Sequence, residues 1–81
     1  MKAIERFKNN FINNDYFISI YKNHIYIINY TNIIDFKSNK IIIRFNEFKL
    51  LIKGINFKIV RKNNIELEII GNFNSMEIVN E

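Results

Sequence analysis

Apolar and polar residues alternate along most of this 81-residue chain, with a period of two from residue 16 onward. Neighbouring side chains of a β-strand point to opposite faces, so this period predicts strands that bury one face. Asn and Lys occupy most of the joints between the runs, and Asn in particular tolerates turn conformations. The predicted strands span 16–21, 24–30, 33–37, 40–46, 48–53, 55–61, 64–70 and 73–79.

The pattern therefore predicts an all-β fold: one small domain, 16–81, with an antiparallel sheet closed as a barrel or stacked as a sandwich, of about seven or eight short strands. Residues 1–15 are expected to form a short helical or irregular segment, because apolar residues there recur at helix-like spacings. The predicted inner face consists of Ile41, Ile43, Leu50, Ile52, Phe57, Ile59, Leu67 and Ile69.

Two glycines, Gly54 and Gly71, each stand where one alternating run ends and another begins. Glycine is favoured where φ is positive or where two backbones approach closely. We therefore expect both glycines to hold strand joints of the same kind.

The amino-acid composition agrees with the predicted all-β domain and adds little to it. The chain is 48% hydrophobic and 15% aromatic, which is a rich supply of core for one small domain. It has no cysteine, which excludes disulfides and thiol chemistry. The net charge is +4, but Ile, Asn and Lys have AT-rich codons, so a low-GC genome accounts for much of the lysine. We expect no transmembrane segment, because no stretch approaches the roughly 20 apolar residues of a span.

No residue pattern points to a reaction. His24 is the only histidine, and a zinc site needs three or four ligands. Asp15 falls in a turn signal and Asp35 in a predicted strand, which is a poor arrangement for an acid–base pair. Phosphate-binding glycine loops are missing as well. We expect no catalytic, cofactor-binding or metal site.

Four basic residues fall on the predicted outer face of successive strands: Arg44, Lys49, Lys53 and Lys58. They are candidates for a stripe that binds nucleic acid or an anionic membrane surface. The favoured alternative is edge protection and cross-strand pairing with Glu47, Glu66 and Glu68. Aromatic residues near the stripe fall on the inner face instead, so we expect weak or no specific nucleic-acid binding.

Six further apolar residues break the pattern by facing outward: Ile28, Tyr30, Ile42, Leu51, Val60 and Ile70. Single exposed apolar residues occur on any protein surface. The alternative is a second buried face, covered by a protein partner or by self-association.

Four segments also follow a recognisable order. Residues 18–23 are an apolar run ending in Lys-Asn, and 25–36 contain Ile-Tyr-Ile-Ile-Asn-Tyr and Ile-Ile-Asp-Phe. A strand–turn–strand unit, 41–54, ends in Leu-Leu-Ile-Lys-Gly, and 65–71 is followed by Asn-Ser-Met-Glu-Ile. In this order and spacing the chain resembles the YabP/YqfC sporulation-protein family of endospore-forming Firmicutes, and is closer to the YqfC branch. Lys22, Asn32 and Phe48 stand where that family has glycine.

The resemblance implies a non-enzymatic protein of the mother cell that acts as a structural or assembly factor during endospore formation. It also implies a partner, a membrane protein of the same pathway, and no catalytic residues or cofactors. The expected location is the mother-cell cytoplasm or the periphery of the membrane around the developing spore. Taken without the resemblance, the basic residues leave a second interpretation open, a small β-barrel that binds nucleic acid.

Overall fold

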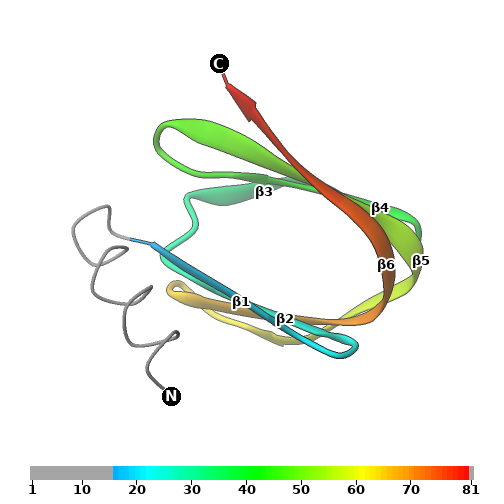
Figure 1. Ribbon diagram of the computed structural model, residues 1–81. Coiled ribbons are helices and arrows are strands. Elements are labelled where there is room, and N and C mark those ends of the chain that lie inside the picture. Colours follow the sequence, from blue (N-terminus) through cyan, green and yellow to red (C-terminus); the bar gives the residue numbers. More distant parts are fainter. Residues whose placement is uncertain (1–15, 81) are drawn as a thin grey trace.

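A single six-stranded antiparallel sheet makes up the fold in the computed structural model, which describes residues 16–80 (Figure 1). The predicted helical or irregular segment lies outside the described residues. Across the sheet the strands follow the order β1-β2-β6-β5-β4-β3. Their bounds are β1 Phe17–Tyr21, β2 His24–Ile28, β3 Asn32–Lys37, β4 Lys40–Arg44, β5 Phe48–Lys62 and β6 Glu66–Asn80.

The two long strands, β5 and β6, pair with each other along most of their length and connect two parts of the sheet. The part we call the β1–β2 layer contains β1, β2, residues 66–70 of β6 and residues 58–62 of β5. The β3–β4 layer contains β3, β4, residues 48–53 of β5 and residues 75–80 of β6. Figure 1 shows β5 and β6 curving between these parts, so that the sheet curls around its own inner face.

Both glycines lie at this bend, and one aromatic ring fills the space beside them. A Cβ on Gly54 would lie 2.2 Å from the backbone oxygen of Asn72 and 2.7 Å from the Phe57 ring. A Cβ on Gly71, whose φ is 150°, would also lie 2.7 Å from that ring. Close backbone approach requires the first glycine, and a positive φ favours the second.

The predicted strand joints at the glycines are wrong, because β5 and β6 continue through the bend. Three register shifts between β5 and β6, at Lys53/Gly54, Ile55/Lys58 and Ile59/Arg61, absorb the irregularity instead. Such bulges bend a strand without ending it. The eight predicted strands therefore merge into six, within the predicted all-β antiparallel class.

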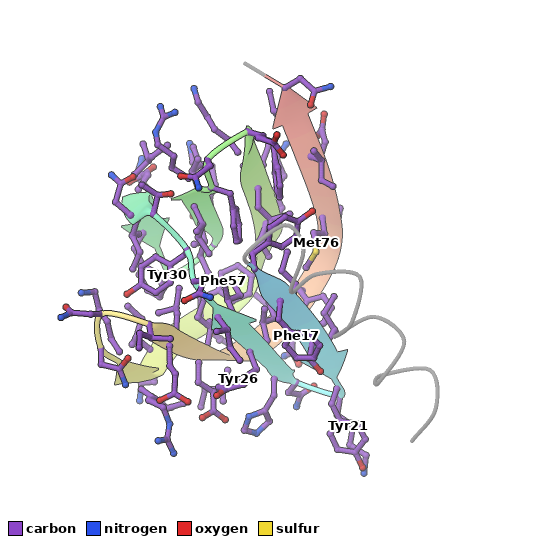
Figure 2. The ribbon with its side chains drawn as sticks, turned by 90° about the vertical axis from the view of Figure 1, so that its left-hand side faces the viewer. Phe17, Tyr21, Tyr26, Tyr30, Phe57 and Met76 are labelled. Atoms are coloured by element: carbon purple, nitrogen blue, oxygen red, sulfur yellow. The ribbon has the colours of Figure 1, made fainter. Side chains whose placement is uncertain are left out.

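The core confirms seven of the eight predicted inner residues, all of them except Ile59. Its buried residues are Ile25, Ile27, Ile41, Ile43, Phe45, Phe48, Leu50, Ile52, Phe57, Leu67 and Ile69. Figure 2 shows Phe57 inside the curled sheet and Tyr21 directed away from it.

The prediction for Ile59 is wrong, because its side chain is 37% exposed. Ile59 lies opposite the buried Ile69, but residues 58–62 of β5 have no strand on their other side within the described chain. An edge position leaves one flank of the side chain uncovered. The alternation in β5 also changes phase at Asn56, whose φ is 60°, so that Ile55 is exposed and Phe57 is buried.

Contacts outside the strand ladders hold the two layers together. Tyr16 lies 5.3 Å from both Phe45 and Phe48, measured between ring centroids, and these two rings stack on each other. Next to the β3–β4 ladder, the amide of Thr31 donates a hydrogen bond of 2.8 Å to the carbonyl of Arg44, which fixes the end of the β2–β3 connection on β4. In the β1–β2 turn, Lys22 has a φ of 52°, a left-handed conformation that glycine adopts more readily than other residues.

We expect Gly54→Ala to destabilise the domain by about 1–3 kcal/mol or more, because the added methyl group meets backbone atoms that cannot move independently. Ser75→Ala, at an exposed position of β6, serves as the matched control and should change stability little. Urea denaturation measures both values. Equal stability of the two variants would contradict the close approach at Gly54.

Phe57→Ala should cost about 3–5 kcal/mol, because it empties the space between the two glycines. Phe17→Ala removes the same side chain from a position that is only half-buried, and it should cost clearly less. Thermal unfolding followed by circular dichroism compares the two. A melting temperature that Phe57→Ala leaves unchanged would show that the ring does not support the bend.

Candidate interaction surfaces

The outer surface of the β3–β4 layer carries a group of cations around two apolar side chains. We call it the basic face and define it by Lys37, Lys40, Ile42, Arg44, Lys49, Leu51 and Lys53. Ile41, Ile43, Leu50 and Ile52 are buried, so the residues between them point outward from β4 and β5. The strand pairing places Ile42 directly opposite Leu51 at the centre.

Like charges stand opposite each other on both sides of this centre. Lys40 pairs in register with Lys53, and Arg44 pairs with Lys49. Lys37 also pairs with Lys40 across the β3–β4 hairpin. Like charges directly opposite on a sheet are destabilising, by a few tenths of a kcal/mol up to about 1 kcal/mol. The sheet therefore carries an arrangement that its own stability does not favour.

Carboxylates of the described strands share this face. Asp35 lies 3.7 Å from the Lys40 ammonium and 4.0 Å from that of Lys37, and these partly exposed pairs contribute little to stability. Glu77 stands opposite Leu51 on β6. Among the described strand residues, the registers thus place five cations and two carboxylates on this face, around Ile42 and Leu51.

The outer surface of the β1–β2 layer has a different character, a network of polar side chains. His24 Nδ1 lies 2.9 Å from Glu68 Oε2, and Arg61 Nε lies 3.5 Å from Glu68 Oε1. The Tyr26 hydroxyl donates a hydrogen bond to Glu66. These side chains satisfy one another across the strands and offer no residue poised for attack on a substrate.

Hydrogen bonding shifts two groups in this network. The bond from the Tyr26 hydroxyl, with a second bond of 3.0 Å from Asn63 Nδ2, lowers the pKa of Glu66. The same bond to Glu66, with some burial, raises the pKa of Tyr26. Both shifts favour the form in which a protonated phenol donates to an ionised carboxylate.

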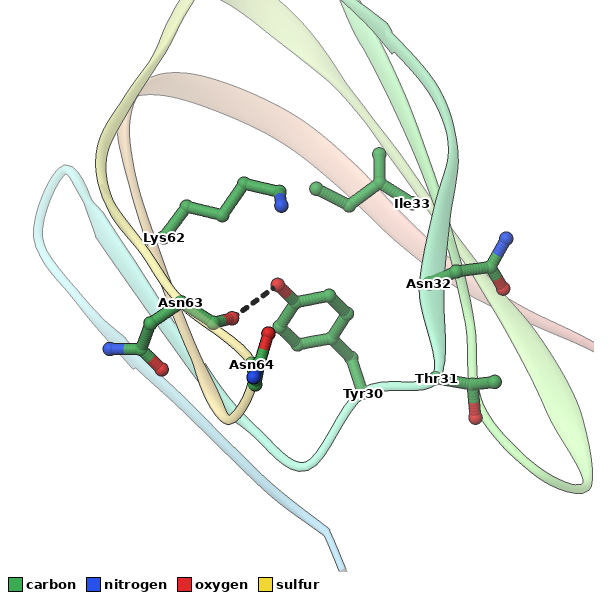
Figure 3. Close-up of a pocket in the computed structure, with 7 residues that line it drawn as sticks. All are labelled: Tyr30, Thr31, Asn32, Ile33, Lys62, Asn63 and Asn64. Atoms are coloured by element: carbon green, nitrogen blue, oxygen red, sulfur yellow. Dashed lines mark hydrogen bonds between the residues drawn. The ribbon is translucent and has the colours of Figure 1, made fainter.

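A small open cavity lies where the β2–β3 connection meets the β5–β6 turn (Figure 3). Its volume is about 350 Å³, and the Tyr30 hydroxyl at its wall donates a hydrogen bond of 2.8 Å to the Asn63 carbonyl. Lys62 supplies the one charged side chain in the lining, beside Ile33 and the amide side chains of Asn32 and Asn64. The lining contains neither a carboxylate nor a histidine, so the cavity lacks an acid–base pair.

The six predicted partner-binding residues do not form one continuous surface. Ile42 and Leu51 are neighbours on the basic face, whereas Ile28 and Ile70 lie on the β1–β2 layer. Tyr30 packs against the core. Val60 is 50% exposed beside the free edge of β5.

The predicted basic stripe is mostly present but differs in membership. Arg44, Lys49 and Lys53 share the basic face, and Lys58 lies beyond the bend, opposite Ile70. Lys37 and Lys40 belong to the surface but were not predicted, because only the register of the two hairpins brings them beside Lys53. No aromatic side chain stands among these cations.

Residues 16–80 lack two further features. The region has no cluster of three or more His, Asp or Glu side chains that would hold a metal ion. It also has no helix that is long and apolar enough to span a membrane.

Comparison with known proteins gives a family match. Residues 18–81 match the family model described as the YabP family. No curated protein and no solved structure matches the chain.

Tyr26→Phe should raise the pKa of Glu66 toward its ordinary value, because it removes the strongest hydrogen bond to the carboxylate. Since the folded-state pKa is lowered, the stabilisation is present above the unfolded pKa and is lost as pH falls through the folded one. Carbon-detected NMR titration of the Glu66 carboxyl measures the shift. The control is Tyr21→Phe, an exposed position outside the network, and the same Glu66 titration in both variants would contradict the assigned cause.

Proposed function

The chain belongs to the YabP family, and on this basis we propose that it is a non-enzymatic sporulation protein that acts through protein contacts. In this proposal it serves as a structural or assembly factor in the mother cell during endospore formation. Its place is the cytoplasm or the periphery of the membrane around the developing spore. A relationship to the YqfC branch in particular, and a membrane protein of the same pathway as the partner, are parts of the proposal.

The observation that carries the proposal is the composition of the basic face. Ile42 and Leu51 present apolar area at the centre, and cations that stand opposite one another in register surround them. A partner with an apolar centre and an acidic rim would cover the first and relieve the second. The Lys and Arg side chains also have apolar stems, which extend the area that such a partner can cover.

Nucleic-acid binding is less well supported by this surface. Base stacking on aromatic side chains supplies much of the affinity for single strands, and the basic face has none. The cations of the basic face are compatible with weak, salt-sensitive attraction to any polyanion. We therefore keep the expectation that specific nucleic-acid binding is weak or absent.

We expect Leu51→Lys to reduce capture of the partner from sporulating cells by about tenfold or more, because it places a further charge at the apolar centre of the contact. Val60→Lys makes the same kind of change at an exposed residue of the other layer, and it should leave capture unchanged. Affinity purification with the tagged full chain, followed by quantitative mass spectrometry, measures the bound partner.

Melting temperatures of the two variants separate a lost contact from a lost fold. Partner capture and sporulation that stay normal in a folded Leu51→Lys protein would rule out the basic face. Recovery of nucleic acid instead of protein, resistant to high salt, would favour the second interpretation over the proposed one.

A further inference from the structure

The bend in the sheet leaves the last part of β6 without a neighbour on one side. Residues 66–70 lie between β2 and β5, but residues 75–80 pair with β5 alone within the described chain. Six consecutive residues, from Ser75 to Asn80, keep regular pairing with β5 along this stretch. Their other edge presents backbone N–H and C=O groups to which a further strand can bind.

The other edges of the sheet carry features that hinder such pairing. β1 is only five residues long. β3 has a register shift between Ile33 and Asp35 and bears charges at Asp35 and Lys37. The free edge of β5 has another register shift and bears Lys58, Arg61 and Lys62. Short length, bulges and lysines are the means by which natural sheets avoid edge-to-edge contact.

Residues 75–80 of β6 lack these protections. Glu77 is their one charged residue, and the stretch contains neither lysine nor proline. Ile78 and Val79 are 60% and 39% exposed, although one belongs to the inner and the other to the outer face of the sheet. Apolar area is therefore open on both sides of an unprotected edge.

We propose that this edge pairs with the same edge of a second copy of the chain, antiparallel across a two-fold axis. A strand that meets its own copy in this way forms an isologous contact, which closes at two chains and cannot grow into a fibre. Two sheets of six strands would then join into one continuous sheet. The proposal does not rest on the basic face and is independent of the partner proposed above.

Charge limits the register of this pairing. A two-fold axis at Glu77 would place two like charges opposite each other, which is unfavourable. An axis at Met76 places Ser75 opposite Glu77, and an axis at Ile78 places Val79 opposite Glu77. Both avoid the charge repulsion and bring side chains of the inner face, Met76 or Ile78, against their own copies.

Because the chain contains no cysteine, single cysteines report the register directly. Met76→Cys or Ile78→Cys should form a disulfide-linked dimer under mild oxidation, since paired residues at the axis have Cα atoms within disulfide range. Ile65→Cys, in the β5–β6 turn at an exposure close to that of Ile78, is the matched control and should form several-fold less dimer. Cross-linking no stronger at either edge position than at residue 65 would overturn the proposal.

Sedimentation equilibrium of the full chain, over a wide dilution series, supplies the second measurement. The unmodified chain should dimerise, and Ile78→Lys should shift the equilibrium to a monomer that keeps its folded circular dichroism spectrum, because residue 78 is largely exposed. Ile65→Lys should dimerise like the unmodified chain. A monomer at every concentration, or a dimer that Ile78→Lys leaves intact, would contradict pairing through this edge.

Discussion

The structure depends on the contact between the Phe57 ring and two glycines at the bend of the long hairpin. Neither Gly54 nor Gly71 has room for a Cβ, because the ring and the opposite backbone occupy that space. With Phe57 in place, β5 and β6 turn together and bring the two layers over one another. A straight hairpin would leave its apolar face in water, so the burial of Ile25, Ile52 and the rest of the core follows from this bend.

The same bend decides which surfaces are available to other molecules. On one side of the bend, β2 pairs with residues 66–70 of β6. On the other side, β4 pairs with residues 49–53 of β5. Residues 75–80 of β6 are therefore left as an open edge. The outer sides of β3, β4 and residues 48–53 of β5 form the basic face. These are the two surfaces that we propose for contact with other molecules.

The sequence predicts much of the core and less of the surface. Period-two alternation identified Ile41, Ile43, Leu67 and Ile69 correctly, because regular strands conserve the phase of their side chains. It failed at Ile59, because this residue lies at an edge of β5 that no described strand covers, whereas Phe57, in the same phase, is buried. Local pattern carries no information about which strand covers a given edge.

Surface clusters are harder to predict because they are assembled from several strands. Lys37 and Lys53 are far apart in the chain and share one row only through the registers of two hairpins. Tyr30 follows the outward phase of β2, but the chain leaves the strand at Asn29, whose φ is 63°, and the ring packs against the core. The family resemblance identified the kind of protein but carried no information on these placements.

The most direct test of the account is the nuclear Overhauser spectrum of the Phe57 ring. The account predicts strong cross-peaks from its ring protons to the α-protons of both Gly54 and Gly71, because both backbones lie in contact with the ring. It also requires that these cross-peaks appear in the same folded species. Cross-peaks to only one glycine, or to neither, would contradict a bend built around Phe57 and the two-layer arrangement that follows from it.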